Sequence, residues 1–115
     1  MSVEILHNPR CSKSRQTLAL LNENGVEPNI IEYLTSPPSK KQLQEILGML
    51  GMGPRDLMRK GEAEYKENNL SNPNLTDEQL LQAMTDYPKL IERPIVLANG
   101  QARIGRPPES VLEIL

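Results

Sequence analysis

The segment from His7 to Arg15 places one cysteine among basic and polar residues. It reads His-Asn-Pro-Arg-Cys-Ser-Lys-Ser-Arg, and Cys11 is the only cysteine in the chain. The segment lies between an expected strand end and an expected helix start. Backbone N–H groups in the first turn of a helix have no partner inside the helix, and they lower the pKa of a thiol placed there. The same donors can hold a tetrahedral oxyanion. The pattern therefore predicts a thiolate nucleophile beside an anion site.

The residues around this cysteine decide between a reactive and a structural thiol. A lone cysteine is more often a small buried hydrophobic residue than a catalyst. Here Arg10, Lys13 and Arg15 add positive charge, and His7 adds more if it is protonated. These basic and polar flanks predict an accessible, reactive Cys11. Metal binding by His7 and Cys11 would need further ligands, which the spacing does not identify.

Three arginines lie in local settings that suit anion binding. Arg59 falls in a Leu-Met-Arg-Lys run, while Arg93 and Arg106 precede Pro94 and Pro107 at the two ends of an expected hairpin. A guanidinium group presents a planar fork that can bind an oxyanion through two hydrogen bonds. Each of these arginines could equally be a solvated surface residue, and spacing alone leaves both interpretations open.

The hydrophobic pattern predicts the elements that must position these side chains. Strands are expected at 3–6, 30–34, 95–97 and 102–104, and helices from about 11, 39, 54, 62, 76 and 107. Ser-x-x-Gln at 39–42 and Thr-x-x-Gln at 76–79 have the form of capping boxes, and Asn-Gly at 99–100 predicts a hairpin turn. In the last helix, Val111, Leu112 and Leu115 form the expected apolar side. The order predicts an α/β domain with a thioredoxin-like fold, spanning 1–115, with a helical insertion at about 39–87.

Composition limits the classes of function. The chain has 115 residues and a net charge of -2, with no Trp, no Phe and three Tyr. This charge and this scarcity of aromatic rings argue against nucleic acid as a partner. We see no signal peptide and no apolar run of membrane-spanning length. A lone thiol indicates a reducing cytoplasm.

These motifs together resemble a known family. The motifs are His-Asn-Pro-x-Cys-x-x-Ser-Arg, Tyr-Leu-x-x-Pro-Pro, Leu-Met-Arg-Lys, Glu-Arg-Pro-Ile-Val and Arg-Pro-Pro-Glu, in this order. They resemble the glutaredoxin-coupled arsenate reductases, and in particular the chromosomally encoded bacterial branch often called YfgD. The resemblance covers the whole chain with matching spacing.

The resemblance implies a thioredoxin-like fold and a reaction. The cysteine matching Cys11 attacks arsenate, glutathione displaces the arsenic-bound oxygen, and glutaredoxin resolves the mixed disulfide and releases arsenite. The residue matching His7 helps to keep the thiol ionised, and Ser14 matches a polar residue beside it. No tightly bound cofactor is implied, and we expect a monomer.

The resemblance also assigns a role to the three arginines. The residues matching Arg59, Arg93 and Arg106 hold the oxyanion and its charged intermediates.

Two alternatives to arsenate reduction stay open. One is a glutathione-dependent thiol oxidoreductase that acts on another substrate. The other is a protein-binding regulator similar to Spx, in which a Cys-x-x-Cys switch would have Ser14 at its second position.

Overall fold

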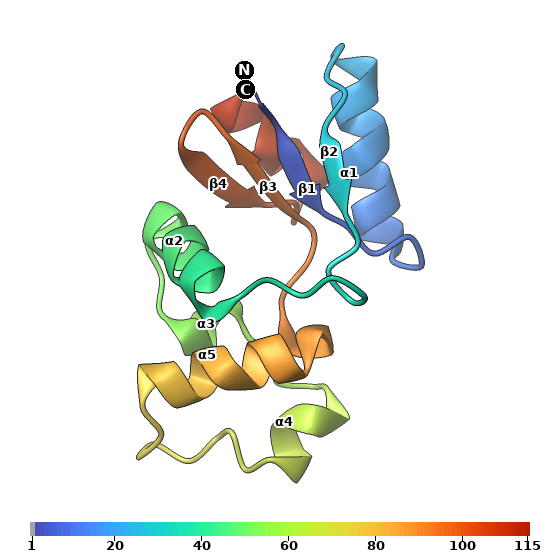
Figure 1. Ribbon diagram of the computed structural model, residues 1–115. Coiled ribbons are helices and arrows are strands. Elements are labelled where there is room, and N and C mark those ends of the chain that lie inside the picture. Colours follow the sequence, from blue (N-terminus) through green and yellow to red (C-terminus); the bar gives the residue numbers. More distant parts are fainter. Residues whose placement is uncertain (1) are drawn as a thin grey trace. The chain divides into compact units, whose positions relative to one another are not determined.

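The computed structural model describes residues 2–115 (Figure 1). The elements in chain order are β1 (Glu4–Leu6), α1 (Ser12–Glu23), β2 (Asn29–Ile31), α2 (Lys40–Leu50), α3 (Pro54–Leu57), α4 (Ala63–Glu67), α5 (Asp77–Asp86), η1 (Pro88–Leu90), β3 (Ile95–Ala98), β4 (Gln101–Ile104) and η2 (Pro108–Ile114). The chain divides into two compact units. The sheet unit comprises the segment up to Ser36 and the segment from Arg93 onward, and the helical unit runs from Pro37 to Glu92.

The sheet unit contains a four-stranded sheet in the order β2-β1-β3-β4 (Figure 1). Strand β1 pairs in parallel with β2 through the α1 crossover, and β3 runs antiparallel to both β1 and β4. Asn99 and Gly100 connect β3 to β4 with φ values of 54° and 71°, as a two-residue hairpin turn requires. The βαβ and ββα halves sharing one sheet confirm the predicted thioredoxin-like fold.

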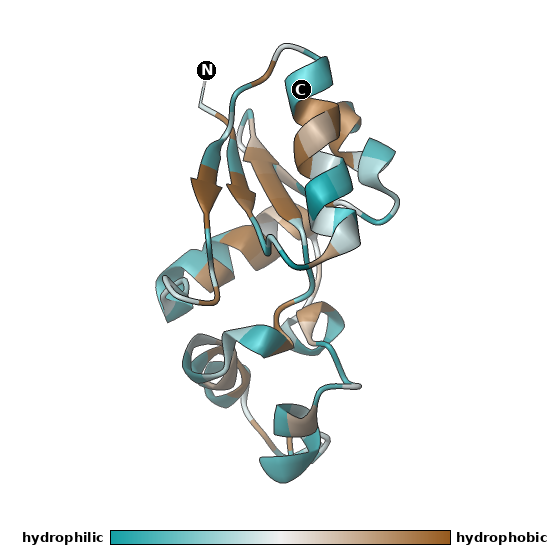
Figure 2. Cartoon of the chain, turned by 90° about the vertical axis from the view of Figure 1, so that its right-hand side faces the viewer, coloured by the Kyte–Doolittle hydropathy of each residue, from teal (hydrophilic) through white to brown (hydrophobic). Residues whose placement is uncertain are grey.

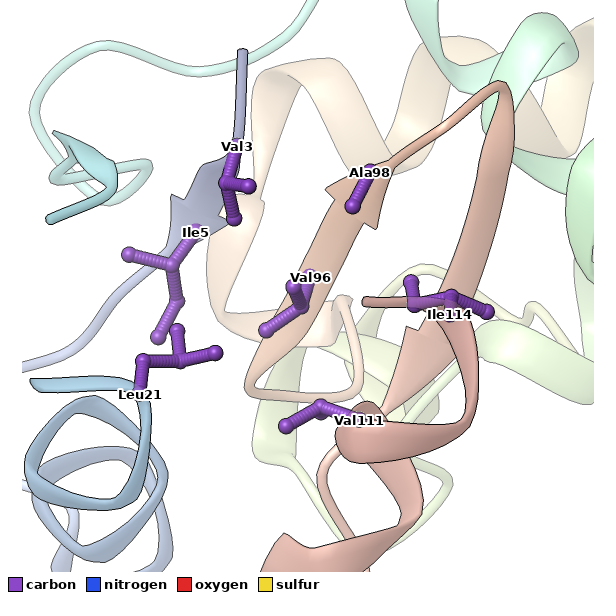
Figure 3. Close-up of a cluster of buried hydrophobic side chains, with 7 residues drawn as sticks. All are labelled: Val3, Ile5, Leu21, Val96, Ala98, Val111 and Ile114. Atoms are coloured by element: carbon purple, nitrogen blue, oxygen red, sulfur yellow. The ribbon is translucent and has the colours of Figure 1, made fainter. Parts of the chain in front are cut away.

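The core of the sheet unit lies between the sheet and two helices. Strand residues and residues of α1 and η2 bury their side chains against one another on one face of the sheet (Figure 3); the cluster consists of Val3, Ile5, Leu21, Val96, Ala98, Val111 and Ile114. Strongly hydrophobic residues occur in the strands and also in the helices that cover them (Figure 2). Burial of these aliphatic side chains fixes the ends of β1 and α1, which carry the Cys11 segment.

Two sequence predictions about this unit were wrong in detail. Strand β2 ends at Ile31 instead of residue 34, because the amides of Thr35 and Ser36 donate to the Glu32 carbonyl and turn the chain. The last helix is a 3-10 helix, which repeats every three residues, so Val111 and Ile114 share its buried face. Of the expected inward residues Val111 is buried, whereas Leu115 is exposed.

The helical unit contains both predicted capping boxes. Ser39 and Gln42 cap α2, and Thr76 and Gln79 cap α5. Both helices bury aliphatic residues, including Leu43, Ile46 and Leu47 of α2 and Leu80, Leu81 and Met84 of α5.

The predicted helix from Pro54 is shorter than expected. It ends at Leu57 rather than continuing through Arg59, because Met58 is extended and forms a β-bridge with Ile91. Within residues 2–115, no helix is long and apolar enough to cross a membrane.

Candidate active site

Cys11 is the N-cap residue of α1. Its backbone is extended, its amide donates to the Asn8 carbonyl at 3.0 Å, and its carbonyl accepts the Arg15 amide at 3.0 Å. The loop after β1 therefore delivers the thiol to the helix start, as predicted. Cys11 is only 9% exposed, so the expectation that its polar flanks keep it accessible was wrong. The tight Asn8–Cys11 turn turns the residue inward while Arg10 stays exposed.

Opposing influences act on the Cys11 thiol. Burial raises its pKa, and this is the largest single influence. The backbone N–H of Ser14, the side chain of Arg93 and the backbone N–H of Lys13 stabilise the thiolate and lower the pKa. The lowering influences together outweigh burial, and the pKa of Cys11 lies below its ordinary value. The helix start and one arginine thus favour a nucleophilic thiolate.

His7 and Ser14 form a buried pair beside this thiol. Ser14 Oγ lies 2.6 Å from His7 Nδ1 and accepts the Asn8 amide at 3.0 Å. Burial lowers the pKa of His7, as does the charge of Arg15, while the Glu32 carboxylate partly opposes them. The net lowering favours neutral His7. The hydrogen bond between its Nδ1 and the Ser14 hydroxyl takes its direction from the tautomer of the ring. His7 thus contributes no fixed positive charge near neutral pH, contrary to one possibility left open by the sequence.

Arg93 and Arg106 lie together in the sheet unit. Arg93 contacts the Cys11 thiol with its side chain, and Arg106 Nε donates to the Arg93 carbonyl at 2.8 Å. The peptide bonds from Arg93 to Pro94 and from Arg106 to Pro107 are both cis. The structure therefore places the Arg93 side chain at the cysteine and the Arg106 side chain against the Arg93 backbone.

Arg59 belongs to the helical unit and has carboxylate neighbours that the sequence analysis missed. Its Nη1 lies 2.5 Å from Glu62 Oε1, and its Nε lies 3.9 Å from Glu92 Oε1. The spacing of Arg59 and Glu62 at i and i+3 is a signal that could have indicated the first contact. The Glu92 contact depends on the bridge between Met58 and Ile91 and could not be read from spacing.

The remaining basic residues of the Cys11 segment lie on its surface. Arg10, Lys13 and Arg15 are exposed, and Arg15 Nη1 donates to the Pro9 carbonyl at 3.1 Å. A cavity of about 320 Å³ is lined by residues 7–10 and by Glu32, Leu34 and Thr35, which follow β2. In the part of the chain that the structure describes, no three His, Cys, Asp or Glu side chains are grouped to hold a metal ion.

The fold and the site define a class of protein: a thioredoxin-like chain with one low-pKa thiol at a helix start. The model of the ArsC family matches residues 6–114. The uncharacterized protein YfgD of Escherichia coli K12 is 60% identical over 114 residues, covering 98% of this chain and 96% of the relative. An arsenate reductase of Haemophilus influenzae is 50% identical over the full length of both chains. The solved structure of an arsenate reductase from Vibrio cholerae is 56% identical, covers 100% of this chain and 98% of that chain, and superposes with a TM-score of 0.97.

The chain belongs to the ArsC family. The family match extends over both units, because residues 6–114 include the helical insertion as well as the sheet. Full-length similarity at this level of identity confirms the relationship that the motifs indicated.

Proposed function

We propose that this chain is an arsenate reductase of the glutaredoxin type. The observation that carries the proposal is the Cys11 thiol at the start of α1, with its pKa below the ordinary value and Arg93 beside it. A thiolate that is also next to an anion-binding guanidinium can attack an oxyanion without first removing a proton. Relatives named arsenate reductase at 40% to 50% identity support the choice of arsenate.

The proposed reaction uses thiols as its only reductants. The Cys11 sulfur attacks arsenic and displaces one arsenate oxygen, which leaves as water after protonation. Glutathione adds to arsenic as a second thiol. The Cys11 and glutathione sulfurs then join in a mixed disulfide, both sulfur–arsenic bonds break, and arsenic keeps two electrons and leaves as arsenite. Glutaredoxin then attacks the mixed disulfide and returns Cys11 to its thiol. Overall, arsenate and two thiols give arsenite, one disulfide and water.

His7 and Ser14 act on the thiol as a pair in this proposal. Neutral His7 shares a hydrogen bond with the Ser14 hydroxyl, and this contact holds the first turn of α1 against the loop that follows β1. The Ser14 amide, which lowers the pKa of Cys11, is thereby kept in place. His7 thus supports ionisation of Cys11 through geometry.

The three arginines bind the oxyanion in this proposal. Arg93 and Arg106 supply two guanidinium groups in the sheet unit, and the Arg106 side chain lies against the Arg93 backbone. Charge-assisted hydrogen bonds from such groups to an anion are the strong ones. The role of Arg59 rests on the family resemblance. Ser14 is the polar side chain beside the thiol.

The setting of the proposed reaction is a reducing cytoplasm. A lone thiol that must cycle through a mixed disulfide needs glutathione and glutaredoxin at hand. We propose that the chain works as one domain over residues 1–115, as a monomer, with glutathione as co-substrate and no tightly bound cofactor.

A coupled assay tests the proposal. Arsenate, glutathione, glutaredoxin, NADPH and glutathione reductase are combined with the protein, and NADPH oxidation is followed. We expect oxidation that depends on arsenate and stops when either glutathione or glutaredoxin is omitted. Cys11→Ser is the matched control, because it changes one atom of the proposed nucleophile.

Other outcomes of the assay identify the alternatives. Glutathionylation of Cys11 without arsenate-dependent turnover would indicate a thiol oxidoreductase for another substrate. Binding of a protein partner that persists in Cys11→Ser, with no turnover, would indicate a regulator. Either result would overturn arsenate reduction as the function.

A further inference from the structure

The guanidinium group of Arg59 is held between two carboxylates in the helical unit. Glu62 engages Nη1 at 2.5 Å, and Glu92 lies 3.9 Å from Nε. The three side chains are between 26% and 28% exposed, so water screens these charges only in part. An anion that approaches Arg59 therefore meets Glu62 as well.

Backbone contacts hold this arrangement in place. The Arg59 amide donates to the Leu90 carbonyl at 2.6 Å, and the Glu92 amide donates to the Leu57 carbonyl at 2.8 Å. The Glu62 amide donates to the Arg59 carbonyl at 3.2 Å. These backbone hydrogen bonds fix the positions from which the Arg59, Glu62 and Glu92 side chains reach one another.

These residues line an open pocket of about 410 Å³. Its lining contains two cations, Arg59 and Lys60, and two carboxylates, Glu62 and Glu92. The formal charges cancel, so the pocket does not attract anions by net charge alone. What it offers is a guanidinium donor next to a carboxylate acceptor, and this combination suits a ligand that is both an anion and a hydrogen-bond donor.

We propose that Glu62 makes the Arg59 pocket select oxyanions that carry a hydroxyl group, such as hydrogen arsenate and hydrogen phosphate, against sulfate. A hydroxyl-bearing oxyanion accepts from Arg59 with one oxygen and donates its O–H to Glu62 with another. Sulfate has no proton at neutral pH, so its oxygens only repel the carboxylate. A site with a hydrogen-bond acceptor discriminates against an analogue that lacks the donor. This inference rests on the proposed function, since it takes Arg59 as an oxyanion-binding side chain.

The experiment compares two anions of similar size on the full chain. Inorganic phosphate and sodium sulfate are titrated at neutral pH and constant ionic strength, and the amide NMR signals of Gly61 and Glu62 report binding. We expect wild-type protein to bind phosphate about tenfold more tightly than sulfate. In Glu62→Gln, whose amide can donate to a sulfate oxygen, the preference should fall to about twofold or less.

The matched control is Glu67→Gln. Glu67 is exposed at the end of α4 and does not line the pocket. Its substitution removes the same negative charge as Glu62→Gln. It should keep the wild-type ratio of the two affinities. Glu62→Asp, which keeps a carboxylate, should retain part of the preference. The ratio of the two affinities also separates selectivity from loss of structure, because a damaged pocket would weaken the binding of both anions alike.

Several results would overturn the inference. Equal affinities in wild-type protein, an unchanged ratio in Glu62→Gln, or no binding of either anion near Gly61 would each do so. Arsenate turnover is measured on the same samples. An active enzyme without discrimination would leave the proposed function intact and remove the role of Glu62. An inactive protein that discriminates would retain the role of Glu62 and remove the proposed function.

Discussion

Ser14 Oγ lies 2.6 Å from His7 Nδ1, although His7 lies in the loop after β1 and Ser14 lies in α1. Ser14 is fully buried and His7 is 6% exposed, so the contact is shielded from water. Ser14 Oγ also accepts the Asn8 amide, and the lowered pKa of His7 favours its neutral form. The two side chains therefore share one hydrogen bond, whose direction follows the tautomer of His7. The pair joins the loop after β1 to the first turn of α1.

Stability should depend on pH through His7, the only histidine in the chain. Burial holds the pKa of His7 below its ordinary value of about 6.5, so the unfolded chain takes up a proton at a higher pH than the folded chain. Stability should fall as the pH drops below about 6.5 and should level off, for this group, below the folded pKa. Urea unfolding of wild-type and His7→Asn protein measures this. In acid, the free energy of unfolding of the wild-type protein should fall more than that of the variant. The same dependence on pH in both proteins would contradict the burial argument.

Alkylation of Cys11 should titrate below the value of a free thiol. The Ser14 and Lys13 amides and Arg93 favour the thiolate more than burial opposes it. The rate of iodoacetamide labelling against pH should have its midpoint below about 8.5. Arg93→Ala should raise that midpoint, because it removes a cation and a hydrogen-bond donor. A wild-type midpoint at or above 8.5 would show that burial dominates.

Cys11→Ser should abolish turnover while the protein stays folded. The chain has no other thiol to form a bond with arsenic, and a serine hydroxyl remains protonated at neutral pH. The change replaces sulfur with oxygen at an N-cap position, where serine is a preferred residue. We expect a thermal midpoint close to that of wild-type protein, measured by circular dichroism. Substantial residual arsenate reduction would exclude covalent catalysis by this thiol.

Lysine at position 93 or 106 should impair the enzyme although the charge is kept. Each lysine loses the planar fork, and Arg106→Lys also loses the Nε contact with the Arg93 carbonyl. With about 1.5–3 kcal/mol for a charge-assisted hydrogen bond, arsenate kcat/KM should fall about tenfold or more. Steady-state kinetics measures this.

Arg103→Lys is the internal control for these two variants. Arg103 lies on β4 of the same hairpin, where its Nε pairs with Glu113 Oε2 at 3.1 Å on the surface. Its replacement should leave the kinetics unchanged. A loss equal to that of Arg106→Lys would mean that the wrong arginine has been assigned.

Arg59→Lys should give a milder loss than the other two arginine variants. A lysine can keep an ion pair with Glu62, and its flexible side chain can still reach an anion as a point charge. We expect arsenate KM to rise by about threefold with little change in kcat. Kinetics over a range of arsenate concentrations separates the two constants. A loss as large as that of Arg93→Lys would show that the fork of Arg59 is essential.

Features encoded over a few residues were predictable from the sequence. The capping boxes at Ser39 and Thr76 and the Asn99–Gly100 turn each depend on local backbone geometry, and the structure contains all of them. The position of Cys11 at a helix start followed from the strand-to-helix transition around it.

Features that depend on distant contacts were not predictable. The burial of Cys11 depends on how its loop folds back, whereas the local pattern of basic residues indicated exposure. The neutral state of His7 depends on burial beside Ser14. Glu92 reaches Arg59 only because Met58 and Ile91 form a bridge between segments far apart in sequence.

The sheet order has a consequence for how the chain is made. Strand β1 lies in the middle of the sheet, and its pairing of Leu6 with Ile95 spans most of the chain. When residues up to Glu92 have emerged from the ribosome, the helical unit is complete, but β1 still lacks its partner strand β3. Until β3 emerges, a row of backbone N–H and C=O groups on β1 is open to pairing with other chains. Aggregation during synthesis is therefore a hazard that lasts until β3 emerges near the end of translation, and a chain that stops before Ile95 keeps that open edge permanently.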